Sequence, residues 1–197
     1  MLNKQMIKFL ENVQSSSQGQ VQLFEQEREY ILKHNLAEAS VLAEEKEKRF
    51  KDAYIERCNK ESEEMIAEES PAFFEHPIAY FKEHAGEFIY VESKWFELIG
   101  ADAVSFELDD VFRTYSVLLG LKLQKKFDAS IREFLHAELA KKQDSFELMF
   151  SSQDGLWDLN FALNDVTGFS ENMILEDAFN LIYSFLFRLA EFTEKTA

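Results

Sequence analysis

Cysteine, glycine, proline and basic residues are all scarce in this chain of 197 residues. The single cysteine, Cys58, excludes an internal disulfide and a cysteine-rich zinc site. The six glycines are too scattered to form a GxGxxG or P-loop motif, and the chain contains no GxSxG motif, so a phosphate-binding loop and a nucleophile elbow are both absent. We therefore expect no cofactor and no metal site, and we favour a non-enzymatic function.

Positive charge is also in short supply. The chain has 21 lysines and arginines against 37 aspartates and glutamates, which gives a net charge of −16. This acidity disfavours nucleic acid and anionic membranes as partners. The most apolar stretch, residues 173–192, contains four charged side chains and is excluded as a membrane span. The N-terminal residues lack the apolar run of a signal peptide, so we expect a cytoplasmic protein.

Residues 20–70 contain neither glycine nor proline. Pairs of charged residues four positions apart with the acid first, such as Glu56 and Lys60, favour a helix over this stretch. We predict an N-terminal helical arm over residues 1–70, with a short helix at 3–13 and a long helix at 20–70. A second capping box at Asn35 leaves open a break near that residue.

Apolar residues recur about every eleven positions along the predicted long helix, a period close to the natural helical pitch. Such a face requires a partner, which is either a neighbouring helix of the same chain or a second copy in a coiled-coil-like dimer. The interface candidates on the arm are Ile31, Leu32, Leu42, Phe50 and Tyr54.

After Pro71 the chain becomes rich in phenylalanine, and residues 71–197 are predicted to form a second domain with its own core. We predict a strand at 88–91, helices at about 110–126 and 129–142, a hairpin at about 145–163 around Asp154-Gly155, and a final helix at 171–193. The predicted fold class is α+β, mostly helical overall, with a small antiparallel sheet flanked by helices. Phe179 and Phe187, on the nearly all-apolar final helix, complete the interface candidates.

Two segments of the second domain resemble PAS sensory domains over about residues 88–165. Residues 88–92 (FIYVE) with 95–100 (WFELIG) are similar to the early strand and short helix of that family. Residues 146–148 (FEL) with 154–157 (DGLW) are similar to its late hairpin. The family's first strand before Phe88 and its last strand after Leu163 have no counterpart in the sequence.

The resemblance to PAS domains implies a module that senses a ligand or partner and carries the signal through its flanking helices, without catalysis. Haem-binding members take an axial histidine from the helix before the late hairpin, and His136 lies on such a helix. The candidate ligand-binding residues are His136, Trp157 and Phe161.

Three functions follow from these observations. We favour a non-enzymatic regulatory or protein-interaction module that acts through the arm and the final helix, as a homodimer or with another protein. The alternative is a sensor for a small apolar molecule or haem. The third is an enzyme with a carboxylate metal site, for which Glu133 and His136 supply only one of the two Glu-x-x-His motifs that a di-iron bundle needs.

Overall fold

The computed structural model describes residues 2–16, 21–45, 48–139 and 146–195. The chain divides into two compact units, Met1–Arg49 and Phe50–Ala197. The division lies well before Pro71, where the sequence had suggested a boundary, because β3 (Tyr54–Asn59) pairs with β5 (Glu87–Glu92) later in the chain and β4 (Met65–Glu69) pairs with β3.

The first unit contains five short elements: α1 (Leu2–Ser16), β1 (Val21–Leu23), α2 (Glu25–Lys33), η1 (Ala39–Val41) and β2 (Leu42–Glu44). The helix predicted at 3–13 is present as α1. Strands β1 and β2 pair in parallel. The unit contains a buried ion pair, in which the Arg49 guanidinium lies 2.7 Å from the Glu27 carboxylate and 4.0 Å from the ring centre of Phe24.

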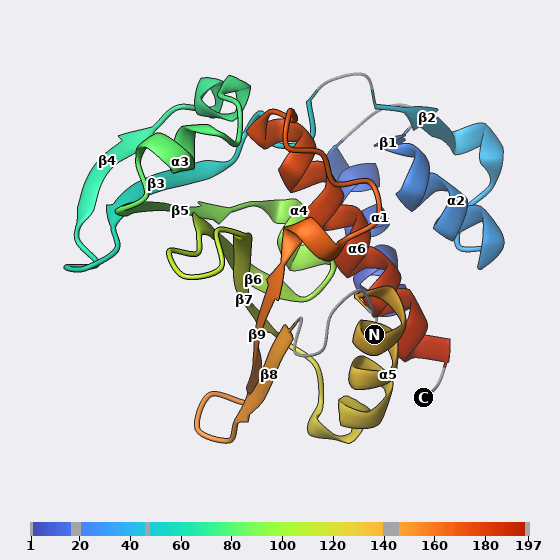
Figure 1. Ribbon diagram of the computed structural model, residues 1–197. Coiled ribbons are helices and arrows are strands. Elements are labelled where there is room, and N and C mark those ends of the chain that lie inside the picture. Colours follow the sequence, from blue (N-terminus) through green and yellow to red (C-terminus); the bar gives the residue numbers. More distant parts are fainter. Residues whose placement is uncertain (1, 17–20, 46–47, 140–145, 196–197) are drawn as a thin grey trace. The chain divides into compact units, whose positions relative to one another are not determined.

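The second unit is built on one seven-stranded antiparallel sheet (Figure 1). The strand order across the sheet is β4-β3-β5-β6-β7-β9-β8. The strands are β3 (Tyr54–Asn59), β4 (Met65–Glu69), β5 (Glu87–Glu92), β6 (Ala101–Leu108), β7 (Tyr115–Leu121), β8 (Phe146–Ser151) and β9 (Leu156–Ala162).

Helices cover one face of this sheet, which we call the inner face. They are η2 (Pro71–Glu75), α3 (Tyr80–Glu83), α4 (Lys94–Leu98), η3 (Lys125–Phe127), α5 (Asp128–Glu138), η4 (Leu163–Asp165) and α6 (Leu175–Lys195). Figure 1 shows α6, in red, running along the sheet with α5 beside its C-terminal half, where Phe134 contacts the rings of Phe185 and Phe192.

The core of the second unit lies between α6 and the inner face. The strand register aligns apolar side chains across the inner face in one row: Ile55, Val91, Val104, Leu119, Leu159 and Leu148. The fully buried Phe179 of α6 contacts the rings of Phe50, Phe74, Phe96 and Phe106 at 5.1–6.3 Å between centroids. The phenylalanines after Pro71 therefore do form the main core, as their distribution in the sequence suggested.

The predicted fold class is wrong in its proportions. The structure is 42% helix and 30% strand over the part of the chain that it describes, with a seven-stranded sheet in place of a mostly helical domain with a small hairpin. The long helix at 20–70 is absent, because residues 54–69 form β3 and β4, which pair with each other and, through β3, with β5. The mixture of helices and strands is confirmed.

The turn between β3 and β4 contains neither glycine nor proline, which is why the sequence did not indicate a hairpin there. The Asn59 side chain accepts hydrogen bonds from the backbone N–H groups of Glu61 and Ser62, and Glu63 adopts a left-handed conformation at φ 57°. An asparagine-centred turn of this kind needs no glycine. Helix α2 also ends without a glycine, since Asn35, which follows the C-cap residue His34, adopts a left-handed conformation at φ 52°.

The helix predicted at 110–126 is also wrong. Residues 109–114 form the turn between β6 and β7, in which Asp109 accepts two backbone hydrogen bonds and Arg113 lies at φ 57°. Elements with clear local signals are confirmed: the strand at 88–91 is the centre of β5, the hairpin around Asp154-Gly155 is β8 and β9, and the final helix is α6.

Candidate functional site

The face of the sheet opposite α6, which we call the open face, has a different composition. One row of directly opposed residues crosses all seven strands in the order Glu68, Glu56, Tyr90, Ser105, Leu118, Asn160 and Glu147. Each of these side chains is half-buried or exposed, whereas almost every apolar residue of the inner face is buried. Neighbouring residues in such a row have Cβ atoms about 4.5–5.5 Å apart, so the row forms a continuous surface.

Two hollows lie on the open face and share Tyr90, Ser105 and Leu118. The larger has a volume of about 520 Å³, and its polar and apolar lining includes Asp102, Gly120, Glu147, Met149, Leu156, Asp158 and Asn160. The smaller has a volume of about 390 Å³ and is completed by Glu56, Cys58, Lys60, Glu63, Phe88 and Glu107. Because they share three residues, the hollows form one concave surface across the sheet.

The two hollows are strongly acidic. Six carboxylates line them (Glu56, Glu63, Asp102, Glu107, Glu147 and Asp158), against one basic side chain, Lys60. Two tyrosines of the open face have raised pKa values. A hydrogen bond to Glu56 raises the pKa of Tyr54 to about 12, and burial with a hydrogen bond to Glu92 raises the pKa of Tyr90 to about 12.

Glu107 is a carboxylate of the smaller hollow whose pKa is raised by its surroundings. Burial raises the pKa of Glu107, and the nearby charges of Asp110 and Asp109 raise it further, although Lys60 opposes them. The Lys60 ammonium lies 3.7 Å from both Glu107 and Asp110, and it donates to the carbonyl oxygen of Leu108. The fold therefore maintains a negative charge here at some cost to its own stability.

The single cysteine lies in the floor of the smaller hollow. Cys58 is 4% exposed, and burial together with the charge of Glu56 raises the pKa of its thiol. A thiol with a raised pKa is a poor nucleophile, because the thiolate is the reactive form. None of the four histidines lines either hollow, so no imidazole lies beside the thiol there, and the neighbouring Glu56 carboxylate disfavours the thiolate.

The turn between β6 and β7 projects two apolar side chains beside the smaller hollow. Val111 is 81% exposed and Phe112 is 78% exposed. The backbone N–H groups of both residues donate to the Asp109 carboxylate, at 2.8 and 2.6 Å, which fixes the turn. We call Val111 and Phe112 the apolar tip. Asp110, which neighbours the tip, connects it to the hollow through Lys60.

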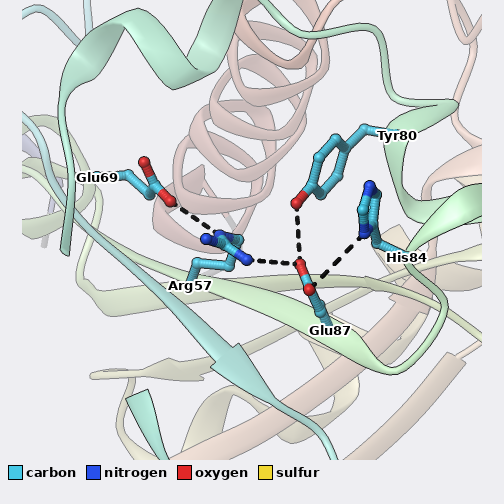
Figure 2. Close-up of polar contacts among 5 residues, drawn as sticks. All are labelled: Arg57, Glu69, Tyr80, His84 and Glu87. Atoms are coloured by element: carbon cyan, nitrogen blue, oxygen red, sulfur yellow. Dashed lines mark hydrogen bonds and ion pairs between the residues drawn. The ribbon is translucent and has the colours of Figure 1, made fainter. Parts of the chain in front are cut away.

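A polar network occupies the opposite, inner face where the sheet reaches β3 and β4. Figure 2 shows Arg57 between Glu69 and Glu87, with the Tyr80 hydroxyl and the His84 imidazole directed toward Glu87. Arg57 donates to Glu69 at 2.8 Å and to Glu87 at 3.1 Å, and Tyr80 donates to Glu87 at 2.9 Å. His84 stacks on Tyr80 and lies 3.8 Å from Glu87.

The network pairs one guanidinium with two carboxylates, which explains the raised pKa of Arg57, where the bond to Glu69 is the largest cause. Arg57 comes from β3, Glu69 from β4, Glu87 from β5 and Tyr80 from α3, and His84 directly follows α3. It therefore holds three strands in register and tethers α3 to them, at a position where the apolar row of the inner face ends. This register in turn places Glu56 opposite Tyr90 on the open face.

The interface residues predicted from the sequence are dispersed. Leu32 and Tyr54 are exposed, with exposed fractions of 36% and 37%. The other candidates are buried: Ile31, Leu42, Phe50, Phe179 and Phe187. Phe50 and Phe179 contact each other inside the core of the second unit. Tyr54 is the member that lies on the open face, where it donates to Glu56.

The three predicted ligand-binding residues do not converge on either hollow. Trp157 and Phe161 are buried on the inner face, where Trp157 contacts Phe150 and Phe161 contacts Phe185. His136 is exposed on α5, and its ring lies 4.9 Å from that of Phe146. The sequence missed the open face itself, although the alternation of β9, with Asp158 and Asn160 opposite Trp157 and Leu159, was a local signal for it.

Within residues 2–16, 21–45, 48–139 and 146–195, no three histidine, cysteine, aspartate or glutamate side chains are grouped so that they could hold a metal ion. Of the helices in the described part of the chain, none has the length and apolar character needed to cross a membrane. No protein-family model matches the chain, and neither the curated proteins nor the solved structures gave a match. The resemblance to PAS domains stays a hypothesis drawn from its short motifs.

Proposed function

We propose that the protein is a non-enzymatic protein-interaction module that binds a basic protein on the open face of its sheet. The observation that carries the proposal is the row of residues across seven strands, with its two hollows lined by six carboxylates and one lysine. A concave surface with an excess of negative charge favours a partner of the opposite charge, both in the final complex and in the rate of encounter.

The chemistry of the open face supports binding over catalysis. Its lining offers carboxylates, amides and hydroxyls, and its one thiol has a raised pKa. Acid–base catalysis would need a group with a pKa near neutral pH, and nucleophilic catalysis would need such a base within hydrogen-bonding distance of a nucleophile. The carboxylates here surround Tyr90 and Leu118 instead, which is the combination of polar margin and apolar centre typical of a protein interface.

The same charges favour a partner other than a second copy of this chain. Two open faces placed against each other would oppose two surfaces with an excess of carboxylates, which is unfavourable. Among the described residues, only Asp102 and Glu107 of the six carboxylates are paired with lysines, Lys122 and Lys60. The homodimer expected from the sequence depended on a continuous helical arm and on the apolar final helix. The described elements of residues 21–69 are short helices and strands, and Phe179 and Phe187 of the final helix are buried. We therefore propose a heteromeric complex.

The apolar tip supplies the contact that charge alone does not. Val111 and Phe112 stand nearly free in solvent, and burying each against a partner would contribute about 1.5–3 kcal/mol. Buried aromatic residues commonly carry much of the affinity of an interface, while charged residues govern its specificity and rate of formation. The tip is preorganised by Asp109, so little conformational entropy is lost when it docks.

The test begins with purification of the partner that the full chain retains and continues with the purified pair in isothermal titration calorimetry. The double variant Glu147→Gln and Asp158→Asn is expected to weaken binding at least tenfold and to reduce its dependence on salt. Glu133→Gln, which removes the same charge from an exposed position on α5, is the matched control and should leave the affinity unchanged. A partner whose affinity ignores the double variant would refute the open face as its binding site.

The apolar tip is tested separately on the same purified pair. Phe112→Ser is expected to weaken binding at least tenfold without changing the salt dependence, because it removes apolar contact and no charge. Stability should be unaffected, since the side chain is exposed. An unchanged affinity would remove the tip from the interface while leaving the acidic hollows in it.

A further inference from the structure

We propose that the smaller hollow of the open face receives an arginine side chain of the partner, with its guanidinium over the Tyr90 ring and against the Glu56 and Glu107 carboxylates. This inference rests on the proposed function, because it names the group by which the partner is recognised.

The strand register places acidic and aromatic side chains next to one another in this hollow. Glu56 of β3 lies directly opposite Tyr90 of β5, and in the next row of the same face Phe88 lies directly opposite Glu107 of β6. Each aromatic side chain therefore has one carboxylate beside it: Glu56 lies next to Tyr90 on the β3 side, and Glu107 lies next to Phe88 on the β6 side. A hollow of about 390 Å³ falls within the volume range of sites that bind small groups.

One side of the hollow already binds a cation of the chain itself. The Lys60 ammonium is held by the Leu108 carbonyl oxygen and lies 3.7 Å from Glu107 and from Asp110. Lys60 thus shows that the carboxylates at this end of the sheet attract a cation. Its ammonium lies near Glu107 and Asp110, whereas Glu56 accepts from Tyr54.

The Glu56 carboxylate can accept further hydrogen bonds, and its partner within the fold is a neutral group. It accepts a hydrogen bond from the neutral hydroxyl of Tyr54 at 2.5 Å. Among the described residues, no lysine or arginine pairs with Glu56. A guanidinium entering from solvent would supply the missing positive charge and could bond the carboxylate through two N–H groups.

Arginine fits this arrangement better than lysine. Its planar guanidinium stacks on aromatic rings and bonds carboxylates in a fork, and it loses less hydration than an ammonium on burial. Tyr90 and Phe88 supply the rings, and Glu56 and Glu107 supply the carboxylates. Burial raises the pKa of Glu107, so its negative charge is unfavourable in the free protein and would become favourable beside a bound cation.

The probe is N-acetyl-arginine-N-methylamide, titrated into the full chain labelled with ¹⁵N and followed by two-dimensional NMR. We expect amide shifts centred on Glu56, Tyr90, Ser105 and Glu107. The corresponding derivative of citrulline, which has the same shape without the charge, should produce no saturable shifts. The lysine derivative should bind at least threefold more weakly than arginine.

Two variants and one control complete the experiment. Glu56→Gln and Glu107→Gln should each reduce the affinity for the arginine probe at least fivefold, whereas Glu133→Gln on α5 should not change it. Equal binding of the lysine and arginine probes, or shifts spread over other acidic surfaces, would overturn the inference. In that case a partner that still responds to Glu147→Gln with Asp158→Asn would leave the proposed function standing, so the two failures are distinguishable.

Discussion

Replacing Phe179 with alanine should destabilise the unit of residues 50–197 by about 4 kcal/mol, since removing a buried phenylalanine side chain costs roughly 3–5 kcal/mol. Phe179 is fully buried on α6, and its ring contacts four others, those of Phe50, Phe74, Phe96 and Phe106. Alanine would leave a cavity at the centre of these rings. The contacts between rings add roughly 0.5–1.5 kcal/mol beyond the area that they bury, which places the expected loss in the upper part of the range.

Urea unfolding followed by tryptophan fluorescence measures this loss. Both tryptophans, Trp95 and Trp157, are buried in the same unit, so their emission reports its unfolding. With a dependence on urea of roughly 1–3 kcal/mol per molar, a loss of about 4 kcal/mol moves the midpoint down by about 2 M. A protein with the usual stability of about 5–15 kcal/mol would lose much of its margin.

The matched control for Phe179→Ala is Phe112→Ala, the same chemical change at a side chain that is 78% exposed. It should alter the free energy of unfolding by less than about 0.5 kcal/mol. If Phe179→Ala cost less than about 1.5 kcal/mol, or no more than Phe112→Ala, the packing of α6 on the inner face would be refuted.

Three further outcomes are expected. Burial raises the pKa of Glu107 above its unfolded value, so ionisation of Glu107 costs stability as pH rises through the folded pKa. Glu107→Gln should therefore have a larger free energy of unfolding than the parent at pH 7, and the difference should vanish below the ordinary glutamate pKa of about 4.3. Urea titrations at acid and neutral pH would measure this difference. In Glu56→Gln the pKa of Tyr54 should fall from about 12 toward 10, measured by NMR of the ring carbons, and an unchanged value would contradict the role of the carboxylate. Gly155→Ala, at φ +71° in the turn between β8 and β9, should cost about 1–2 kcal/mol in thermal or urea unfolding, whereas Gly86→Ala, with no atom within 4 Å of the added Cβ, should cost less than that.

Local signals in the sequence were sufficient for several elements. The Asp154-Gly155 turn between two alternating segments predicted the hairpin of β8 and β9. The start of α4 depends on a signal of the same local kind, since the Ser93 hydroxyl accepts a bond from the Trp95 N–H. Each of these signals depends on residues within a few positions of one another, so it survives in any tertiary context.

The strands β3 and β4 could not be predicted in the same way. Glu56 and Lys60 have the spacing of a helical ion pair, yet in the strand Glu56 accepts from Tyr54, while Lys60 reaches Glu107 and Asp110 of distant elements. Such pairs contribute only about 0.2–0.5 kcal/mol each to a helix. A helix would satisfy the same backbone groups, but pairing β3 with β4 and β5 also buries Ile55 and Cys58 in the sheet, which contributes more than such ion pairs.

The sequence by itself determined the acidity of the chain, the concentration of phenylalanine after Pro71 and the segments that alternate or turn. Only the tertiary structure decided that Glu56, Tyr90, Leu118 and Asn160 lie in one row, since they come from four strands spread over about a hundred positions of the chain. The physical reason is that a sheet face is assembled by register. A shift of one residue in any strand would exchange its inner and open faces, and local sequence contains no record of which partner strand fixes that choice.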